Sequence, residues 1–177
     1  MTALSHPPPL SGEGFVLRPF RKADVTPDHE AIEDPSSARW LNPVSSGEPD
    51  VVFAAMEVER KAGRMLAFTI ADASDDRYLG AIVLFMKEFD TGELAYVVAP
   101  EARGQGLARS AVELLGAWAV AELGVQRLQL RIDPENEASQ RVALAAGYQR
   151  EGVLRSAFVV RGERRDVEMW SRLPRDD

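Results

Sequence analysis

The sequence predicts a single α/β domain of the mixed α+β kind, with a mostly antiparallel sheet. Strand-like segments fill the early and final parts of the 177 residues, and a strand–helix–strand–helix run lies between them. Such a crossover implies at least one parallel pair of strands. No repeat or linker divides the chain. We therefore expect one domain over residues 13–177, preceded by a flexible lead-in over residues 1–12 that contains three consecutive prolines.

The first half of the chain predicts three strands and two helices. A turn-rich stretch over residues 34–47 carries Trp40 and Leu41, which either anchor that loop or form the wall of a pocket. Proline in the first strand places that strand near a sheet edge. The expected strands span residues 15–20, 65–71 and 78–87, and the expected helices span residues 24–32 and 50–62.

The second half predicts the crossover and a closing hairpin. The clearest helix begins at Leu107, repeats apolar residues at three- and four-residue steps, and ends at Gly124. A second helix covers residues 136–146 and ends at Gly147. The expected strands span residues 93–98, 128–132, 152–158 and 167–173, with a polar turn over 161–166 between the last two.

Composition excludes several classes of function. There is no cysteine, so a disulfide framework, a thiolate zinc site and a cysteine nucleophile are excluded; with two histidines, we expect no metal. With a net charge of −7, the protein is not expected to have the basic surface of a nucleic-acid binder. The strongest apolar run, residues 79–86, is too short to cross a bilayer. We therefore expect a cytoplasmic protein without membrane or nucleic-acid partners.

The junction between residues 98 and 108 has the pattern of an anion site. A strand ends, Gly104 and Gly106 follow two residues apart, and a long helix begins at once. Unpaired amides and the positive helix end then face whatever lies before the turn, which suits a phosphate or pyrophosphate. A tight turn that needs glycine only for its conformation is the alternative. The dinucleotide fingerprint fails at Arg109, and the nucleoside-triphosphate loop lacks its Gly-Lys-Ser/Thr ending.

The spacing Val98, four residues, then Arg103-x-x-Gly106-x-Ala108 resembles the coenzyme motif of the Gcn5-related N-acetyltransferase (GNAT) superfamily. The run over residues 136–141, with Ala146-Gly147-Tyr148, resembles its ribosomal-protein N-acetyltransferase branch. The segments Leu17-Arg18-Pro19, Arg39-Trp40-Leu41 and residues 151–155 extend the resemblance over nearly the whole chain.

The resemblance implies a three-layer fold, with helices on both faces of the sheet and the parallel strands splayed to admit acetyl-CoA. Val97, Val98 and Ala99 would offer backbone hydrogen bonds to pantetheine, and the Val98 N–H would face the thioester oxygen. The loop of Arg103, Gly104, Gln105, Gly106, Leu107 and Ala108 would hold the pyrophosphate.

The resemblance also implies direct attack by an amine, without a covalent enzyme intermediate. Asn136 would contact pantetheine, and Ser139 would stabilise or protonate the leaving thiolate. Many relatives use a tyrosine seven residues beyond the asparagine, where this chain has Ala143. Helix capping by Asn136 and an ordinary surface hydroxyl at Ser139 are the alternatives.

Glu93, at the start of the coenzyme strand, is the candidate general base, directly or through water. Weaker candidates are Glu88, Asp166 and Glu168; for each of these carboxylates the sequence favours a solvated surface group over a catalytic role.

The sequence therefore favours an enzyme that moves acetyl from acetyl-CoA to a primary amine. The acceptor could be a protein amino terminus or a small molecule, in a pocket formed by residues 24–42 and 161–166. A non-catalytic acyl-CoA sensor is the alternative, since the tyrosine is missing. Resemblance alone suggests a homodimer.

Overall fold

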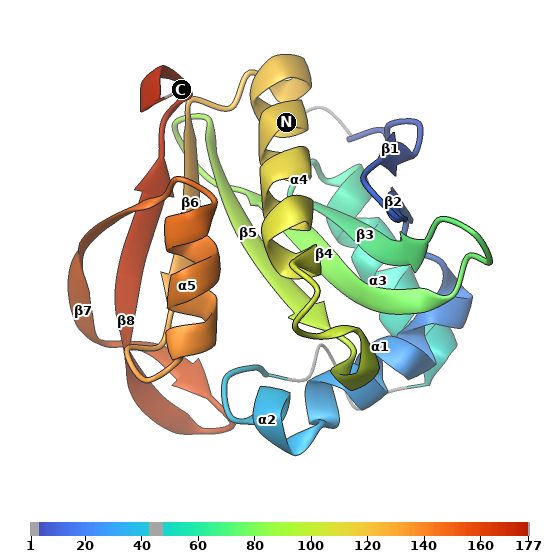
Figure 1. Cartoon of the computed structure of the whole chain (residues 1–177), viewed down its shortest axis with the longest axis horizontal. Coiled ribbons are helices and arrows are strands. Elements are labelled where there is room, and N and C mark those ends of the chain that lie inside the picture. The colour runs from blue at the N-terminus through green and yellow to red at the C-terminus, as the bar shows by residue number, and fades with distance from the viewer. Residues whose placement is uncertain (1–3, 43–47, 177) are drawn as a thin grey trace.

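The computed structural model describes residues 4–42 and 48–176 of the chain. Eight strands form one sheet in the order β1-β2-β3-β4-β5-β6-β8-β7 (Figure 1). Only β5 and β6 pair in parallel; the other neighbours are antiparallel, as predicted. The strands are β1 (Leu10–Ser11), β2 (Phe15–Pro19), β3 (Met65–Asp72), β4 (Tyr78–Met86), β5 (Thr91–Val98), β6 (Arg127–Ile132), β7 (Gln149–Val160) and β8 (Glu163–Arg172).

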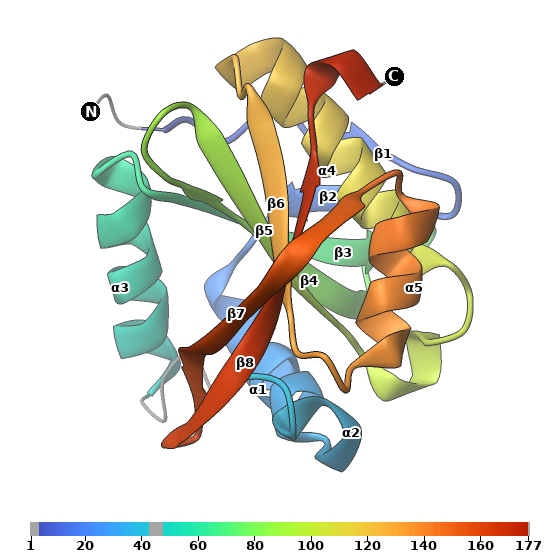
Figure 2. The same ribbon diagram turned by 90° about the vertical axis from the view of Figure 1, so that its left-hand side faces the viewer.

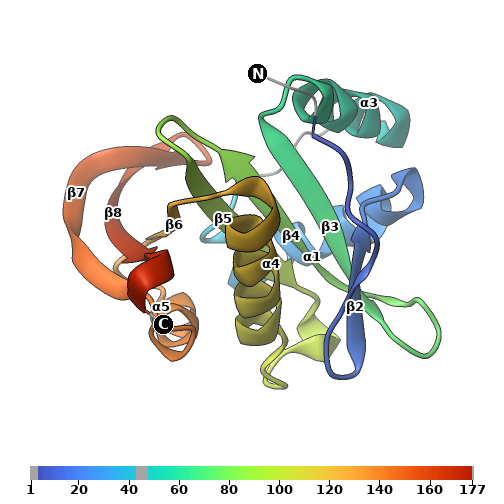
Figure 3. The same ribbon diagram turned by 90° about the horizontal axis from the view of Figure 1, so that it is seen from above.

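The helices cover both faces of the sheet, which confirms the predicted layering. Figure 3 shows α4 and α5 on one face and α1 and α3 on the other. Their bounds are α1 (Val25–Glu33), α2 (Pro35–Ala38), α3 (Pro49–Lys61), α4 (Leu107–Leu123) and α5 (Glu137–Ala145), with 3-10 turns η1 (Lys22–Asp24), η2 (Pro100–Ala102) and η3 (Pro174–Asp176).

Each face of the sheet packs its own apolar core. On β5, Leu94 contributes to the core under α4 and α5, whereas Val97 belongs to the core under α1 and α3. Alternate residues of a strand point to opposite faces, so β5 contributes side chains to both cores. α4 lies between Gly106 and Gly124, which both adopt left-handed backbone conformations that glycine tolerates best.

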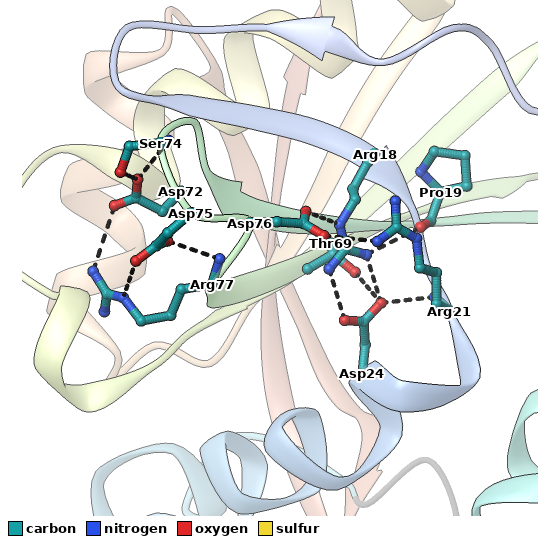
Figure 4. A network of polar contacts seen from close by, with 10 residues as sticks. All are labelled: Arg18, Pro19, Arg21, Asp24, Thr69, Asp72, Ser74, Asp75, Asp76 and Arg77. Carbon is teal, nitrogen blue, oxygen red and sulfur yellow. Dashed lines mark hydrogen bonds and ion pairs between the residues drawn. The ribbon is translucent and has the colours of Figure 1, made fainter.

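A buried ion pair ties the start of α1 to the sheet (Figure 4). The Arg18 guanidinium donates to both Asp24 carboxylate oxygens, at 2.7 and 2.9 Å, and to Asp76 at 2.5 Å. Asp24 also accepts from the Thr69 hydroxyl at 2.7 Å. Buried charges need such complete pairing, which explains the arginine in the Leu17-Arg18-Pro19 segment.

The structure adds detail that the sequence pattern did not show. The stretch expected to be turn-rich contains α2, whose first turn is capped by Asp34; residues 43–47 lie outside the described residues. Leu4 bonds to Arg60 at the end of α3, and β1 pairs with β2; residues 1–3 are not described, so flexibility of the lead-in stays a prediction. The last two strands are longer than expected; they form one end of the sheet and run diagonally in front of β6 in Figure 2.

Candidate coenzyme and acyl-transfer site

The parallel strands β5 and β6 separate part-way along their length. They pair only through Thr91, Gly92 and Glu93 of β5, and β5 continues to Val98 without a partner in β6 (Figure 1). Unpaired backbone N–H and C=O groups along this gap can bind an extended ligand as an added strand would. The structure thus contains the splayed pair that the resemblance implies.

Val98 is the residue at the end of β5 whose backbone faces the gap. The Ala99 N–H donates to the Leu79 carbonyl of β4 at 2.9 Å. Because hydrogen-bonded pairs alternate along an antiparallel ladder, Val97 also directs its backbone toward β4, and the Val98 N–H points away from it. Of the three residues expected to bind pantetheine, Val98 retains a backbone donor for a ligand in the gap.

The loop before α4 has an open surface. Gly104 and Gly106 have φ of +75° and +78°, and a Cβ built on either would meet nothing within 4 Å. Amides at the first turn of a helix lack intrahelical partners and attract anions. Both features fit a pyrophosphate group resting on the backbone.

The side chain of Arg103 is hydrogen-bonded to other residues of the protein. Its guanidinium donates to the Val98 carbonyl at 3.1 Å, to Asp34 at 2.9 Å and to the Ser37 hydroxyl at 2.9 Å, and it also contacts Ser36. Arg103 therefore joins the anion loop to α2, and its backbone is what remains for a phosphate.

The N-terminal end of α5 completes the opposite wall. Asn136 caps this helix by accepting from the Ser139 amide at 3.1 Å, as the capping alternative predicts. The Ser139 hydroxyl accepts a hydrogen bond of 3.2 Å from Tyr96 of β5. Burial raises the pKa of Tyr96 to about 12, so its hydroxyl stays protonated.

These elements enclose one cavity of about 780 Å³, within the usual range for small-molecule sites. Predicted site residues that line it are Val97, Val98, Arg103, Gly104, Gly106, Leu107, Ala108, Asn136 and Ser139. Ala99, Gln105 and Glu93 are not among its lining residues.

Glu93 lies where the two strands part, and its carboxylate is fully engaged. One oxygen accepts from Arg131 at 2.6 Å, with Lys87 at 3.6 Å, and the other accepts from Gln129 at 2.9 Å. Both carboxylate oxygens therefore already accept a hydrogen bond from a side chain of β6. Of the weaker candidates, Glu168 binds Arg150 and Trp170, and Asp166 accepts from the Ser156 amide. Glu88 is exposed, in the turn before β5.

The two segments expected to form the acceptor pocket lie side by side. Arg161, in the turn between β7 and β8, donates to Glu33 of α1 at 2.8 Å and to the Ala38 carbonyl at 2.8 Å. Its amide donates to Asn42 at 2.7 Å, and Asn42 donates to the Val159 carbonyl at 2.6 Å.

The sequence pattern missed two contributors to the cavity. Tyr96 could have been found because it lies two residues before Val98 and so shares its face of β5. The α2 wall, with Ser36 and Ser37, follows from contacts distant in sequence. Trp40 and Leu41 line the cavity, as one of the two alternatives for this stretch predicts. Arg39 stacks on the Trp40 ring and pairs with Glu135 at 2.6 Å.

A family model described as "Acetyltransferase (GNAT) domain" matches residues 15–149. The chain belongs to the GNAT acetyltransferase family. Enzymes of the GNAT family carry out acyl-CoA-dependent acetyl transfer.

Curated relatives agree with this GNAT assignment. The chain is 28% identical over 175 residues to "Uncharacterized N-acetyltransferase p20" of Bacillus licheniformis, covering 94% of this chain and 97% of that protein. It is 32% identical over 113 residues to "Probable N-acetyltransferase YjcK" of Bacillus subtilis, covering 62% of each chain.

Solved GNAT structures share the fold at lower identity. Mycobacterium smegmatis RimJ in complex with CoA-disulfide has a TM-score of 0.81 at 22% identity, covering 97% of this chain and 88% of its own. Spermidine N-acetyltransferase from Vibrio cholerae, with CoA and spermine, has a TM-score of 0.80 at 20% identity, covering 93% and 98%. Ribosomal-protein-S5-alanine acetyltransferase from Vibrio fischeri also has a TM-score of 0.80 at 20% identity, covering 94% and 97%. The acceptors named for these last two structures differ, so the shared fold does not select the acceptor.

Over residues 4–42 and 48–176, no group of three or more histidine, aspartate or glutamate side chains is placed to hold a metal ion. Within the same residues, no helix has the length and apolar character needed to span a bilayer.

Proposed function

We propose that this GNAT enzyme acetylates primary amines that are partly neutral at working pH, above all the α-amino group of a peptide. The observation that carries this proposal is the engagement of Glu93 by Arg131 and Gln129. Both oxygens of Glu93, the leading candidate for a base, therefore already accept hydrogen bonds. The acceptor must then supply its own neutral nitrogen.

The basicity of amines determines how much help each acceptor needs. An α-amino group has a pKa of about 7.7 to 8.0, so roughly a tenth of it is neutral at pH 7. A lysine-type amine, with a pKa of about 10.4, is neutral about once in a few thousand molecules. At pH 7 the neutral, reactive fraction of the α-amine is therefore roughly several hundredfold larger than that of the lysine-type amine. Without an efficient base, the α-amine keeps this advantage.

In this proposal the chain positions acetyl-CoA and stabilises developing charge. The Val98 N–H faces the gap and would donate to the thioester oxygen as negative charge grows there. Backbone amides of the loop from Gly104 to Ala108 would hold the pyrophosphate. Asn136 and Ser139 would lie along pantetheine, with Ser139 nearest the departing sulfur.

The test is thiol release from acetyl-CoA with a panel of amines. We expect short peptides with free amino termini to react faster than N-blocked lysine peptides and spermidine. The rate should rise with pH as the pKa of the α-amine is passed. The same peptides with acetylated amino termini and no lysine are the matched control, and they should give only background release.

Two results would contradict the proposal. Faster reaction of blocked lysine peptides or spermidine would show that a base operates in the site. Tight binding of acetyl-CoA without thiol release for any amine would instead indicate a sensor of the coenzyme.

A further inference from the structure

Two hydroxyl groups from opposite walls meet inside the coenzyme cavity. Tyr96 comes from β5 and Ser139 from α5, 43 residues later, and both line the cavity. The Tyr96 hydroxyl donates to the Ser139 oxygen at 3.2 Å. The Ser139 oxygen therefore accepts this hydrogen bond, and the proton of the Ser139 hydroxyl remains free to be donated to another group.

Nothing else in α5 supplies an acidic hydroxyl at this point. Ala143 occupies the position where many relatives have a tyrosine, and it is fully buried in the core with Tyr148. Among the side chains of α5, Ser139 is then the hydroxyl that can donate to the sulfur.

We propose that Tyr96 is a positioning residue for acetyl transfer, which holds the Ser139 hydroxyl so that its proton points at the coenzyme sulfur. The inference rests on the proposed acetyltransferase function. Without the Tyr96 hydroxyl, Ser139 can rotate toward other acceptors, as serine hydroxyls in helices do. Hydrogen bonds in series also polarise one another, which makes Ser139 a stronger donor.

The step balances without a covalent enzyme species. The amine nitrogen forms a bond to the acetyl carbon, the carbon–sulfur bond breaks, and the sulfur keeps the electron pair. Ser139 donates a hydrogen bond to the thiolate, which needs no immediate proton because a thiol has a pKa of about 8.5. The proton of the new amide nitrogen leaves to solvent, and the thiolate gains one from solvent. Tyr96, with its pKa raised by burial to about 12, remains a donor throughout.

The chain offers a matched control for loss of a buried tyrosine hydroxyl. Tyr148 is 2% exposed, and its hydroxyl has no hydrogen-bond partner among the described residues. Tyr148→Phe therefore removes the same atom from a neighbouring tyrosine without removing a hydrogen bond.

The experiment measures kcat and acetyl-CoA affinity for the full chain and its Tyr96→Phe, Ser139→Ala, double and Tyr148→Phe variants. Tyr96→Phe should lower kcat about two- to tenfold, the value of one neutral hydrogen bond, with coenzyme affinity by calorimetry unchanged. Ser139→Ala should lower kcat about ten- to thousandfold. The double variant should match Ser139→Ala, since Tyr96 acts only through Ser139, and Tyr148→Phe should match the unmodified enzyme.

Full kcat in Tyr96→Phe would overturn the inference, and so would a double variant whose loss equals the product of the two single losses. In both cases acetyl transfer by the unmodified chain leaves the proposed function intact. If the unmodified chain transfers acetyl to no amine, the proposed function is wrong, and the inference that rests on it is wrong as well.

Discussion

Glu93 lies at the end of the parallel pairing and is 5% exposed, with Arg131 and Gln129 on its two oxygens. The position of Glu93 along β5 suggested a base, but partners from β6 bond to both of its carboxylate oxygens. A base must reach the proton that it removes, with a free lone pair and a suitable pKa. The arrangement instead fits a role in holding the two strands at the point where they part.

Glu93→Gln tests this interpretation. The amide keeps the size of the side chain and can still accept from Arg131, so kcat/KM for a peptide α-amine should fall less than about tenfold, below the usual effect of losing a base. The measurement is thiol release across pH, with Ser139→Ala as a variant that should lose more. A hundredfold loss, with a shifted pH profile, would identify Glu93 as the base.

At the scale of elements, the anion site depends on the conformation of one turn and one helix end. Gly106 precedes α4 and Gly124 follows it, with φ of +78° and +68°, and neither has a neighbour within 4 Å of a built Cβ. The two glycines therefore carry similar backbone strain when substituted. They differ in that Gly106 lines the coenzyme cavity and Gly124 does not.

Gly106→Ala and Gly124→Ala should each lower the free energy of unfolding by about 1–2 kcal/mol, because an L-residue is strained in this conformation. Only Gly106→Ala should weaken acetyl-CoA binding, by about tenfold or more, because its methyl group stands where the pyrophosphate would approach. Calorimetry on both folded variants measures this. Equal loss of affinity in both would show that the glycines serve the fold alone.

At the scale of the whole molecule, a half-buried carboxylate joins α1 to the sheet. Asp28 accepts from the Tyr78 hydroxyl at 2.7 Å, and burial raises the pKa of Asp28 to about 6. Between about pH 4 and 6 the folded protein keeps a proton that the unfolded chain releases. Protonated Asp28 therefore stabilises the folded protein below that range, and this stabilisation is lost as pH rises through about 6.

Asp28→Asn should remove this part of the pH dependence. Relative to the unmodified protein, the variant should gain stability between pH 4 and 7, by about 1–3 kcal/mol, since one pKa unit corresponds to about 1.4 kcal/mol. Denaturant unfolding at several pH values measures it, and Asp50→Asn on the exposed start of α3 controls for loss of one carboxylate. Parallel pH profiles for Asp28→Asn and the unmodified chain would contradict the assignment.

The sequence by itself determined the order and type of most elements, the parallel crossover, the turn before α4 and the family. These follow from local signals: apolar periodicity, glycine at left-handed positions and the spacing of a short motif. Only the tertiary structure decided what each side chain does. Arg103 faces α2, Arg131 of β6 engages Glu93, and Tyr96 meets Ser139. Such contacts join residues far apart in the chain, and their geometry depends on strand register and packing, which local patterns do not specify.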